Sequence, residues 1–452
     1  MKKLEDISAY SCHAPSTGIR LRSRYLQNPD SASDLSIFGV KIEARACHFW
    51  QNEVLKKSPI ARKMDTKSQD LIMQRWNVVQ HELIPELRND VGTLTPKLEK
   101  VIHILDWVRI EEFTGPGWCG VGRHPHERAW LANAFVAKAV LGLATTAALI
   151  ERLTTDRALR RICGFPMCKK LPSEATFSRA FDEFAEGKLA ERVHGMLVEE
   201  YLGDELIGHL SRDGTAIEAR ERPKRCEAEV PVATEPPDLL STQDKAATTP
   251  VTPAPAKRRG RPRHGEKRAP AKESPIKRQR QQTLAQMMAE IPTDCDRGTK
   301  CNAQGYKISW NGYKLHIDTA DCGVPVSALL SSASMHDSRA AIPLSLISAA
   351  RVTSLYDVMD AAYCSGELHE HCRGLGHVPL IDHNPRGGEK EEFEPTDAVR
   401  YNERTVAERS NARLKDEFGG RTVRVKGGTK VMGHLMFGIL ALSADQLMRL
   451  RQ

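Results

Sequence analysis

Hydrophobic positions change their spacing once along this chain of 452 residues. Up to residue 203, apolar residues recur every three or four positions, which predicts amphipathic helices. From residue 305 onward they alternate with polar residues or form short runs, which predicts strands between helices. The predicted helices span 77–87, 93–113, 127–153, 173–185, 338–352, 365–376 and 401–418, and the predicted strands span 206–220, 306–320, 324–333, 354–363 and 377–385.

The most apolar stretch, residues 129–153, is interrupted by Asn133 and Lys138 and is rich in Ala and Thr. A membrane-spanning helix needs about 20 consecutive apolar residues. The stretch therefore predicts a buried helix of a soluble protein. The opening sequence MKKLEDISAY turns acidic where a signal peptide has its apolar core, and the 11 cysteines are odd in number and scattered, which favours a cytoplasmic location.

A segment of different composition, residues 223–292, separates the two regions. It is rich in Pro, Ala, Thr, Lys and Glu, and no Phe, Trp or Tyr occurs from Leu202 to Gly305. Residues 257–280 carry 11 Lys or Arg and 2 Glu, whereas the net charge of the whole chain is +8, so the rest of the chain is close to neutral. Such a composition cannot bury enough apolar surface to offset the entropy of ordering. We expect a basic insert that is disordered or loosely ordered.

The centre of this insert, residues 257–263, reads Lys-Arg-Arg-Gly-Arg-Pro-Arg and resembles an AT-hook. Glycine lets the backbone approach the floor of the minor groove of DNA, where Arg259 and Arg261 meet enhanced negative potential, while Arg263 and its neighbours neutralise phosphates. The alternative is a nonspecific polycationic tether. Both interpretations predict contact with DNA.

Two acidic residues stand at informative places in the predicted strands. Asp213 lies in the middle of the strand 206–220, where an acid is unfavourable, so it either faces solvent or has a chemical use. Asp360 follows the buried run 355–359, at the edge where open α/β sheets present ligand-binding groups. We interpret Asp357 as a surface or salt-bridged residue.

Four chemically distinct side chains share one face of the predicted helix 401–418. At 100° per residue, Tyr401, Arg404, Glu408 and Lys415 fall within about 60° of one another. A solvated face with Glu–Arg pairing would explain the charges but predicts no fixed spacing. A carboxylate that holds a metal between cations that grip phosphate oxygens would explain both.

Residues 401–415 match the pattern Tyr-x2-Arg-x3-Glu-x6-Lys, and in this the chain resembles the insertion-sequence DDE transposases that carry the YREK signature. Residues 298–338 resemble the central strands of that family, and 358–365 its second-aspartate strand. Residues 122–153 and 171–181 resemble its helical N-terminal domain. The resemblance covers roughly residues 70–440.

This resemblance implies an α/β RNase H-like catalytic domain, a mixed sheet flanked by helices, in which Asp213, Asp360 and Glu408 form a DDE triad that holds two Mg²⁺ ions, with Mn²⁺ as a substitute. Three hard-oxygen ligands suit such a metal pair on chemical grounds as well. Tyr401, Arg404 and Lys415 would contact DNA. The implied activity is metal-dependent endonuclease cleavage and strand transfer during DNA transposition and recombination.

The expected organisation has four parts. Residues 1–70 are of uncertain structure, 71–203 form a mostly α-helical domain that binds the element's ends, 204–222 with 293–445 form the catalytic domain, and 223–292 form the disordered insert. The expected partners are the terminal inverted repeats, target DNA and a second copy of the chain, in the bacterial cytoplasm and associated with the nucleoid, without a membrane. The alternatives are a catalytically inactive DNA-binding descendant of a transposase and an RNase H-like nuclease of other purpose.

Three smaller features complete the predictions. His336-Asp337, at the start of helix 338–352, is interpreted as a helix cap rather than as part of the site. Residues 174–184 predict a core helix that buries Phe177, Phe181 and Phe184, with a DNA-reading helix as the alternative. Residues 419–430 are basic and follow the Glu408 helix directly, which favours a DNA-contacting loop.

Overall fold

A computed structural model describes residue 85 and residues 94–115, 126–223, 273–301, 304–385 and 389–451. All of them belong to one compact unit, Trp76–Gln452. The AT-hook-like residues Arg259, Arg261 and Arg263, the rest of 224–272 and residues 1–70 lie outside the described residues.

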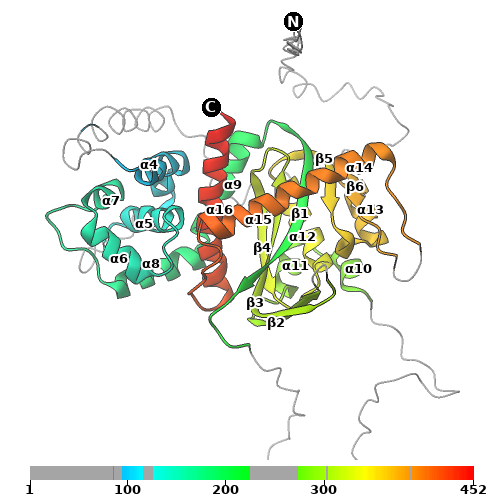
Figure 1. Ribbon diagram of the computed structural model, residues 1–452, viewed down its shortest axis with the longest axis horizontal. Coiled ribbons are helices and arrows are strands. Elements are labelled where there is room, and N and C mark those ends of the chain that lie inside the picture. Colours follow the sequence, from blue (N-terminus) through cyan, green and yellow to red (C-terminus); the bar gives the residue numbers. More distant parts are fainter. Residues whose placement is uncertain are drawn as a thin grey trace, which may run out of the picture. The chain divides into compact units, whose positions relative to one another are not determined.

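A six-stranded mixed sheet forms the centre of the α/β region (Figure 1). The strand order is β2-β3-β1-β5-β6, and β4 pairs with the second half of β3. β1 runs parallel to β5, and β5 runs parallel to β6, whereas β3 is antiparallel to β1, β2 and β4. The strands are β1 Leu206–Glu218, β2 Asp296–Cys301, β3 Lys307–Ala320, β4 Pro325–Ser332, β5 Thr353–Met359 and β6 Val378–Ile381.

Helices cover both faces of this sheet. Successive side chains of a strand point to opposite faces, so Asp213, which meets α15, and Arg212, which is bonded on the side of α12, lie on opposite faces. α12 therefore packs on one face and α15 crosses the other (Figure 1). The helices of this region are α10 Pro275–Gln279, α11 Leu284–Glu290, α12 Ser338–Ala349, α13 Gly366–Gly374, α14 Pro395–Tyr401 and α15 Thr405–Glu417, with the 3-10 turns η3 Ala361–Tyr363 and η4 Asn402–Arg404. This mixed sheet flanked by helices fits an RNase H-like fold.

The last helix, α16 Gly428–Leu450, contacts both the sheet and the helices that lie between residues 96 and 202. Those helices are α4 Pro96–Val108, η2 Ile110–Phe113, α5 Arg128–Val140, α6 Thr146–Thr155, α7 Arg157–Ile162, α8 Glu174–Glu186 and α9 Leu189–Leu202.

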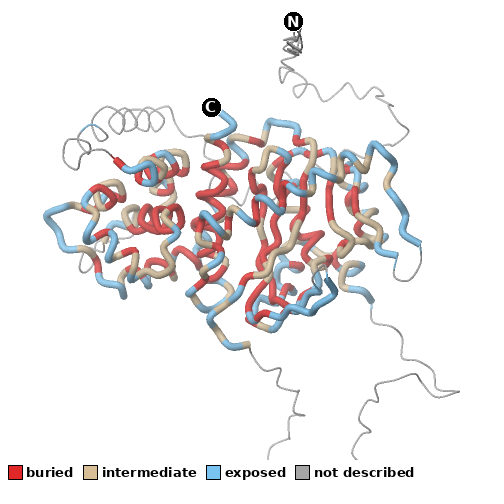
Figure 2. The backbone as a smooth tube through the Cα atoms, in the orientation of Figure 1, coloured by how far each residue is buried: buried red, intermediate tan, exposed pale blue. Residues whose placement is uncertain are grey.

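α16 contacts α4, α5, α8 and α9 as well as β4. It is long and apolar enough to cross a membrane, but 78% of its apolar window is buried inside the protein (Figure 2). One hydrophobic cluster runs from Phe135 through Leu440 to Leu315. The helical region and the sheet therefore share a single core.

Two predictions about these segments were wrong. The apolar stretch 129–153 is not one helix: it breaks at 141–145, where Gly142 has φ +64° and Thr145 caps α6 by accepting a bond from the Ala148 amide. Residues 273–292 are not part of a disordered segment, because α10 and α11 bury Met287 and Ile291 against the helices behind the sheet. A few apolar residues at the right spacing are enough to form these two helices, although the average composition of the segment predicted no ordered structure.

The prediction for residues 174–184 was confirmed. α8 buries Phe177, Phe181 and Phe184, and all three rings pack around Phe135 of α5 at centroid distances of 5.1–6.2 Å. This helix is a core element.

Candidate active site

Asp213 and Asp360 lie at the same edge of the sheet because their strands are parallel neighbours. The last paired residues of β1 and β5 are Arg212 and Met359, so each aspartate is the next residue along its own strand. β1 continues alone on this side, which explains how an acid is accommodated in the middle of a long strand. Asp360 caps η3, and its Oδ1 accepts a hydrogen bond of 3.0 Å from the Ala362 amide.

The helix α15 is hydrogen-bonded to β1 beside Asp213. Asn411 Nδ2 donates to Asp213 Oδ2 at 2.9 Å, and Lys415 Nζ donates to Thr215 Oγ1 at 2.6 Å. The turn η4 contributes a third contact, since Ser211 Oγ donates to the Glu403 carbonyl at 3.2 Å. Sequence reasoning missed Asn411, although its place three residues after Glu408, on the same side of the helix, is a usable signal.

The predicted helix 401–418 is three pieces rather than one. Tyr401 ends α14, Arg404 ends η4, and Glu408 and Lys415 lie in the first and last turns of α15. Arg404 and Glu408 still share one face across the junction of η4 and α15, because Arg404 Nη2 donates to Glu408 Oε1 at 2.6 Å. The side chain of Glu408 is 51% exposed, so this carboxylate is the least confined of the three predicted acids.

Arg404 lies in the electrostatic field of all three acids. Its own pKa is raised, because the effects of Glu408, Tyr401, Asp213 and Asp360 together outweigh that of its burial. Glu408 is bonded to this guanidinium and the charges of Asp213 and Asp360 act on it, while Tyr401 packs against Phe393 at a centroid distance of 4.8 Å.

The pKa values of the two aspartates are raised, so both hold a proton more readily than exposed acids do. Burial raises the pKa of Asp213, and the charge of Asp360 adds to that effect, against Arg404 and the bond from Asn411. Burial likewise raises the pKa of Asp360, opposed by the bond from the Ala362 amide and assisted by Asp337. Crowded carboxylates of this kind are characteristic of sites where a cation is held.

The donor set fits a divalent metal in its chemistry. Carboxylate oxygens are the hard ligands that Mg²⁺ takes, and the buried Oδ1 of Asn411 and hydroxyl of Tyr363 have no hydrogen-bond partner among the described residues. In the arrangement described, no three His, Cys, Asp or Glu side chains approach closely enough to hold an ion within residues 94–115, 126–223, 273–301, 304–385 and 389–451. Glu408 is bonded to Arg404 instead.

A buried ionic layer supports Asp213 from the opposite face. Arg212, 1% exposed, donates two bonds of 2.7 Å to the carboxylate of Asp318, which also accepts one from Ser348 Oγ of α12. Asp357 is 1% exposed and bonded to His377 Nδ1 at 3.0 Å, so the surface interpretation was wrong and the paired one was right. A charge pair with this geometry holds the strand in one register.

His336-Asp337 stands at the start of α12, as the cap interpretation expects, with Asp337 in the N-cap position. The side chain of Asp337 makes no capping hydrogen bond, and its backbone is helical, with φ −59° and ψ −35°. Its Oδ1 instead accepts a bond of 2.9 Å from Lys314 Nζ, while His336 Nδ1 pairs with Ser338 Oγ at 2.7 Å.

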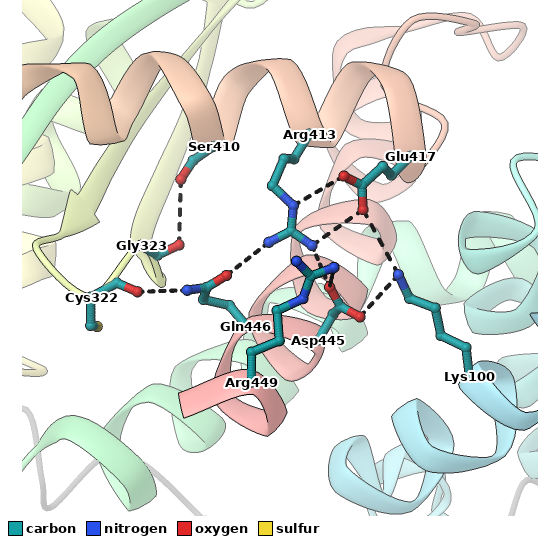
Figure 3. Close-up of polar contacts among 9 residues, drawn as sticks. All are labelled: Lys100, Cys322, Gly323, Ser410, Arg413, Glu417, Asp445, Gln446 and Arg449. Atoms are coloured by element: carbon teal, nitrogen blue, oxygen red, sulfur yellow. Dashed lines mark hydrogen bonds and ion pairs between the residues drawn. The ribbon is translucent and has the colours of Figure 1, made fainter. Parts of the chain in front are cut away.

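The far end of α15 is held by a polar cluster around Asp445 (Figure 3). The Asp445 carboxylate, whose side chain is 7% exposed, meets Lys100 at 2.9 Å, Arg449 at 3.1 Å and Arg413. Arg413 Nη1 donates to Gln446 Oε1 at 2.8 Å, and Gln446 Nε2 donates to the Cys322 carbonyl at 2.8 Å. The cluster connects α15 with α4, α16 and the β3–β4 turn.

The basic segment 419–430 connects α15 to α16. Arg421 pairs with Asp416, and Lys430 pairs with Asp182 of α8 at 2.8 Å. The guanidinium of Arg421 is 70% exposed. The predicted contact of this segment with DNA stays a prediction.

Two family comparisons match this chain. Residues 274–444 match the sequence model of the family described as Transposase DDE domain, and residues 81–183 match that described as Transposase domain (DUF772). No curated protein and no solved structure matches the chain.

Together the two matches support a DNA transposase of the insertion-sequence DDE class, an enzyme of the nuclease and transposase type. Asp360 and Glu408 lie inside the first match and Asp213 lies outside both. The first match begins at residue 274, so it includes α10 and α11, which pack against the helices of the α/β region.

Proposed function

We propose that this protein is a DNA transposase that binds the terminal inverted repeats of an insertion sequence and catalyses metal-dependent strand cleavage and strand transfer. The observation that carries the proposal is that Asp213 and Asp360 both follow the point where the parallel neighbours β1 and β5 stop pairing, and that Glu408 lies on a helix bonded to β1. The two transposase-family matches support the same conclusion.

Asp213, Asp360 and Glu408 would form the DDE triad and hold two Mg²⁺ ions, or Mn²⁺ in their place. Such ions supply activation of the attacking water or DNA 3′-hydroxyl and stabilisation of the leaving oxygen. Asp213 and Asp360 are fixed by their strands and by bonds from Asn411 and Ala362. Glu408 must leave Arg404 to join them, and its exposure leaves room for that rotation.

Tyr401, Arg404 and Lys415 would bind the DNA backbone. Arg404, released from Glu408, can donate to phosphate with its planar fork, and Tyr401 and Lys415 flank the same opening. Arg259, Arg261 and Arg263 would add contacts in the minor groove. We further propose that the protein works as a homodimer on two element ends in the bacterial cytoplasm, associated with the nucleoid through DNA.

The test is cleavage and mobilisation of a marker flanked by the gene's own flanking DNA. The full chain is supplied in trans with Mg²⁺, and wild type is compared with Asp360→Asn and Glu408→Gln. The matched control is Glu403→Gln, which removes a neighbouring charge of the same kind, since Glu403 contributes only its carbonyl to β1. We expect both triad variants to lose at least ~1,000-fold in rate, about 4 kcal/mol of transition-state stabilisation, and the control to keep its activity.

The alternative, a catalytically inactive DNA-binding descendant, predicts a different result. Specific binding to the ends without movement by any version, or equal movement by wild type and Asp360→Asn, would remove the catalytic proposal. The family matches do not favour that alternative.

A further inference from the structure

A second acid–cation pair lies beside the proposed site, on the opposite face of the sheet from Glu408. Asp337, at the start of α12, accepts a bond from Lys314 Nζ at 2.9 Å, and both side chains are largely enclosed, at 24% and 17% exposed. Lys314 is also bonded to the Met335 carbonyl at 2.9 Å. The lysine is thereby fixed at this end of β3.

The carboxylate of Asp337 packs directly over the residue that follows Asp213. A Cβ atom placed on Gly214 would lie 3.3 Å from Asp337 Oδ1 and 3.1 Å from His316 Nδ1. Glycine leaves the room that lets an acid from α12 approach β1 one residue from Asp213. The approach is made from the sheet face opposite to α15.

Two buried polar atoms near this acid have no hydrogen-bond partner among the described residues. His316 is fully buried, its Nε2 pairs with Ser331 Oγ at 2.9 Å, and its Nδ1 faces Gly214 without a partner. The hydroxyl of Tyr363, 1% exposed, is likewise unpaired and lies in the field of Asp337, Asp213 and Asp360. Buried polar atoms without partners are rare in proteins and mark places where a ligand, ion or water belongs.

The charge of Asp337 also reaches the proposed triad. Burial raises the pKa of Asp360, and among the acidic groups around it Asp337 raises that pKa most, ahead of Asp382. The charge of Asp337 therefore acts on Asp360, the acid that follows β5.

We propose that Asp337 is a fourth carboxylate of the active site, which faces the divalent-metal site from α12 as Glu408 faces it from α15. The proposal rests on the proposed function. Each of the two helix-borne acids is paired with a cation in the arrangement described, Glu408 with Arg404 and Asp337 with Lys314. A metal held by these carboxylates would compete with both cations.

The competing explanation is a purely structural pair that fastens α12 to β3. The two explanations predict different changes in metal affinity when the charge of Lys314 is removed. If the pair is structural, removing either partner has the same effect. If Asp337 serves the metal, removing its carboxylate weakens metal binding, whereas removing the competing cation strengthens it.

The experiment measures Mn²⁺ binding to the full-length protein without DNA, by electron paramagnetic resonance of free Mn²⁺ with Mg²⁺ as competitor. We expect Asp337→Asn to weaken binding on the order of 10-fold and Lys314→Met to strengthen it. Asp416→Asn, which removes an exposed aspartate paired with Arg421, is the matched control and should leave the affinity unchanged.

Parallel losses in Asp337→Asn and Lys314→Met, or no loss in Asp337→Asn, would overturn the inference. Lys314→Met keeps the test decisive if Asp337→Asn does not fold, because a structural pair predicts no gain in affinity. Asp360→Asn separates the two proposals. If it weakens Mn²⁺ binding while Asp337→Asn does not, only the fourth carboxylate is wrong, and if it has no effect, the metal-dependent function itself fails.

Discussion

The two ends of α15 are held very differently. At its C-terminal end, Arg413 joins a buried carboxylate that three cations surround, and the cluster reaches α4, α16 and the β3–β4 turn (Figure 3). At its N-terminal end, Glu408 has one bond, to Arg404, and half of its side chain faces solvent. The difference teaches that the C-terminal end of α15 is anchored, which leaves Glu408, the acid that we propose to hold metal, free to change partners.

The largest expected effect concerns the anchored end. Asp445→Ala removes the shared partner of Lys100, Arg413 and Arg449, whose side chains are 30%, 19% and 55% exposed, so we expect a cost of about 1.5–3 kcal/mol. Urea unfolding should show that loss in the free energy of unfolding. Asp182→Ala, which breaks the more exposed pair with Lys430, is the control and should cost well under 1 kcal/mol. Equal effects of the two variants would remove the anchor.

The pH dependence at Asp445 has a definite sign. Burial alone would raise its pKa, but Lys100 and Arg413 lower it below the ordinary value. A carboxyl with a lowered folded-state pKa contributes stability that is present above the unfolded value of about 3.9 and is lost as pH falls through the folded value. The gap between wild type and Asp445→Ala should therefore close only in strongly acidic solution.

A smaller effect of opposite sign is expected at Asp360, where β1 and β5 stop pairing. Burial raises the folded-state pKa of Asp360, so its charge destabilises the fold above the unfolded value of about 3.9. Asp360→Asn keeps the acceptor for the Ala362 amide and should raise the unfolding midpoint at neutral pH in EDTA. The advantage should shrink as pH falls through the raised pKa, and Mg²⁺ should stabilise wild type but not the variant. A variant less stable than wild type in EDTA would contradict the crowding of Asp213 and Asp360.

The smallest effect on stability belongs to the free end. Glu408→Gln breaks a half-exposed i,i+4 pair, which is worth about 0.3–0.5 kcal/mol. Thermal unfolding should be nearly unchanged, although cleavage is lost. A large fall in the unfolding temperature would mean that Glu408 is a structural residue, and the contrast between the two ends would disappear.

Much of the site could be predicted from local sequence. The apolar run before Asp360, the long strand around Asp213 and the fixed spacing from Tyr401 to Lys415 are short-range signals, and the structure has the corresponding elements. Their convergence depends on the parallel register of β1 and β5, which no local pattern states. The family resemblance supplied that step.

The features that the sequence did not predict share a physical cause. Each of them depends on contacts between residues that are far apart in the sequence. Asp337 meets Lys314 and Gly214 through strand register, so the sequence motif at its position indicated only a helix start. α16 was not assigned, because its apolar residues surround the helix on all sides as it passes through the core. α10 and α11 were hidden by the polar composition around them, and their few apolar side chains became informative only against α12.

The most direct measurement of the central claim is to locate the metal on the full-length chain. Fe²⁺ substituted for Mg²⁺, with ascorbate and peroxide, cuts the polypeptide close to the ion. The account predicts cuts around residues 213, 360 and 408 that excess Mg²⁺ suppresses and that Asp360→Asn abolishes. Cuts elsewhere in the chain, or cuts at these positions that neither Mg²⁺ nor Asp360→Asn affects, would contradict a metal-dependent DDE site.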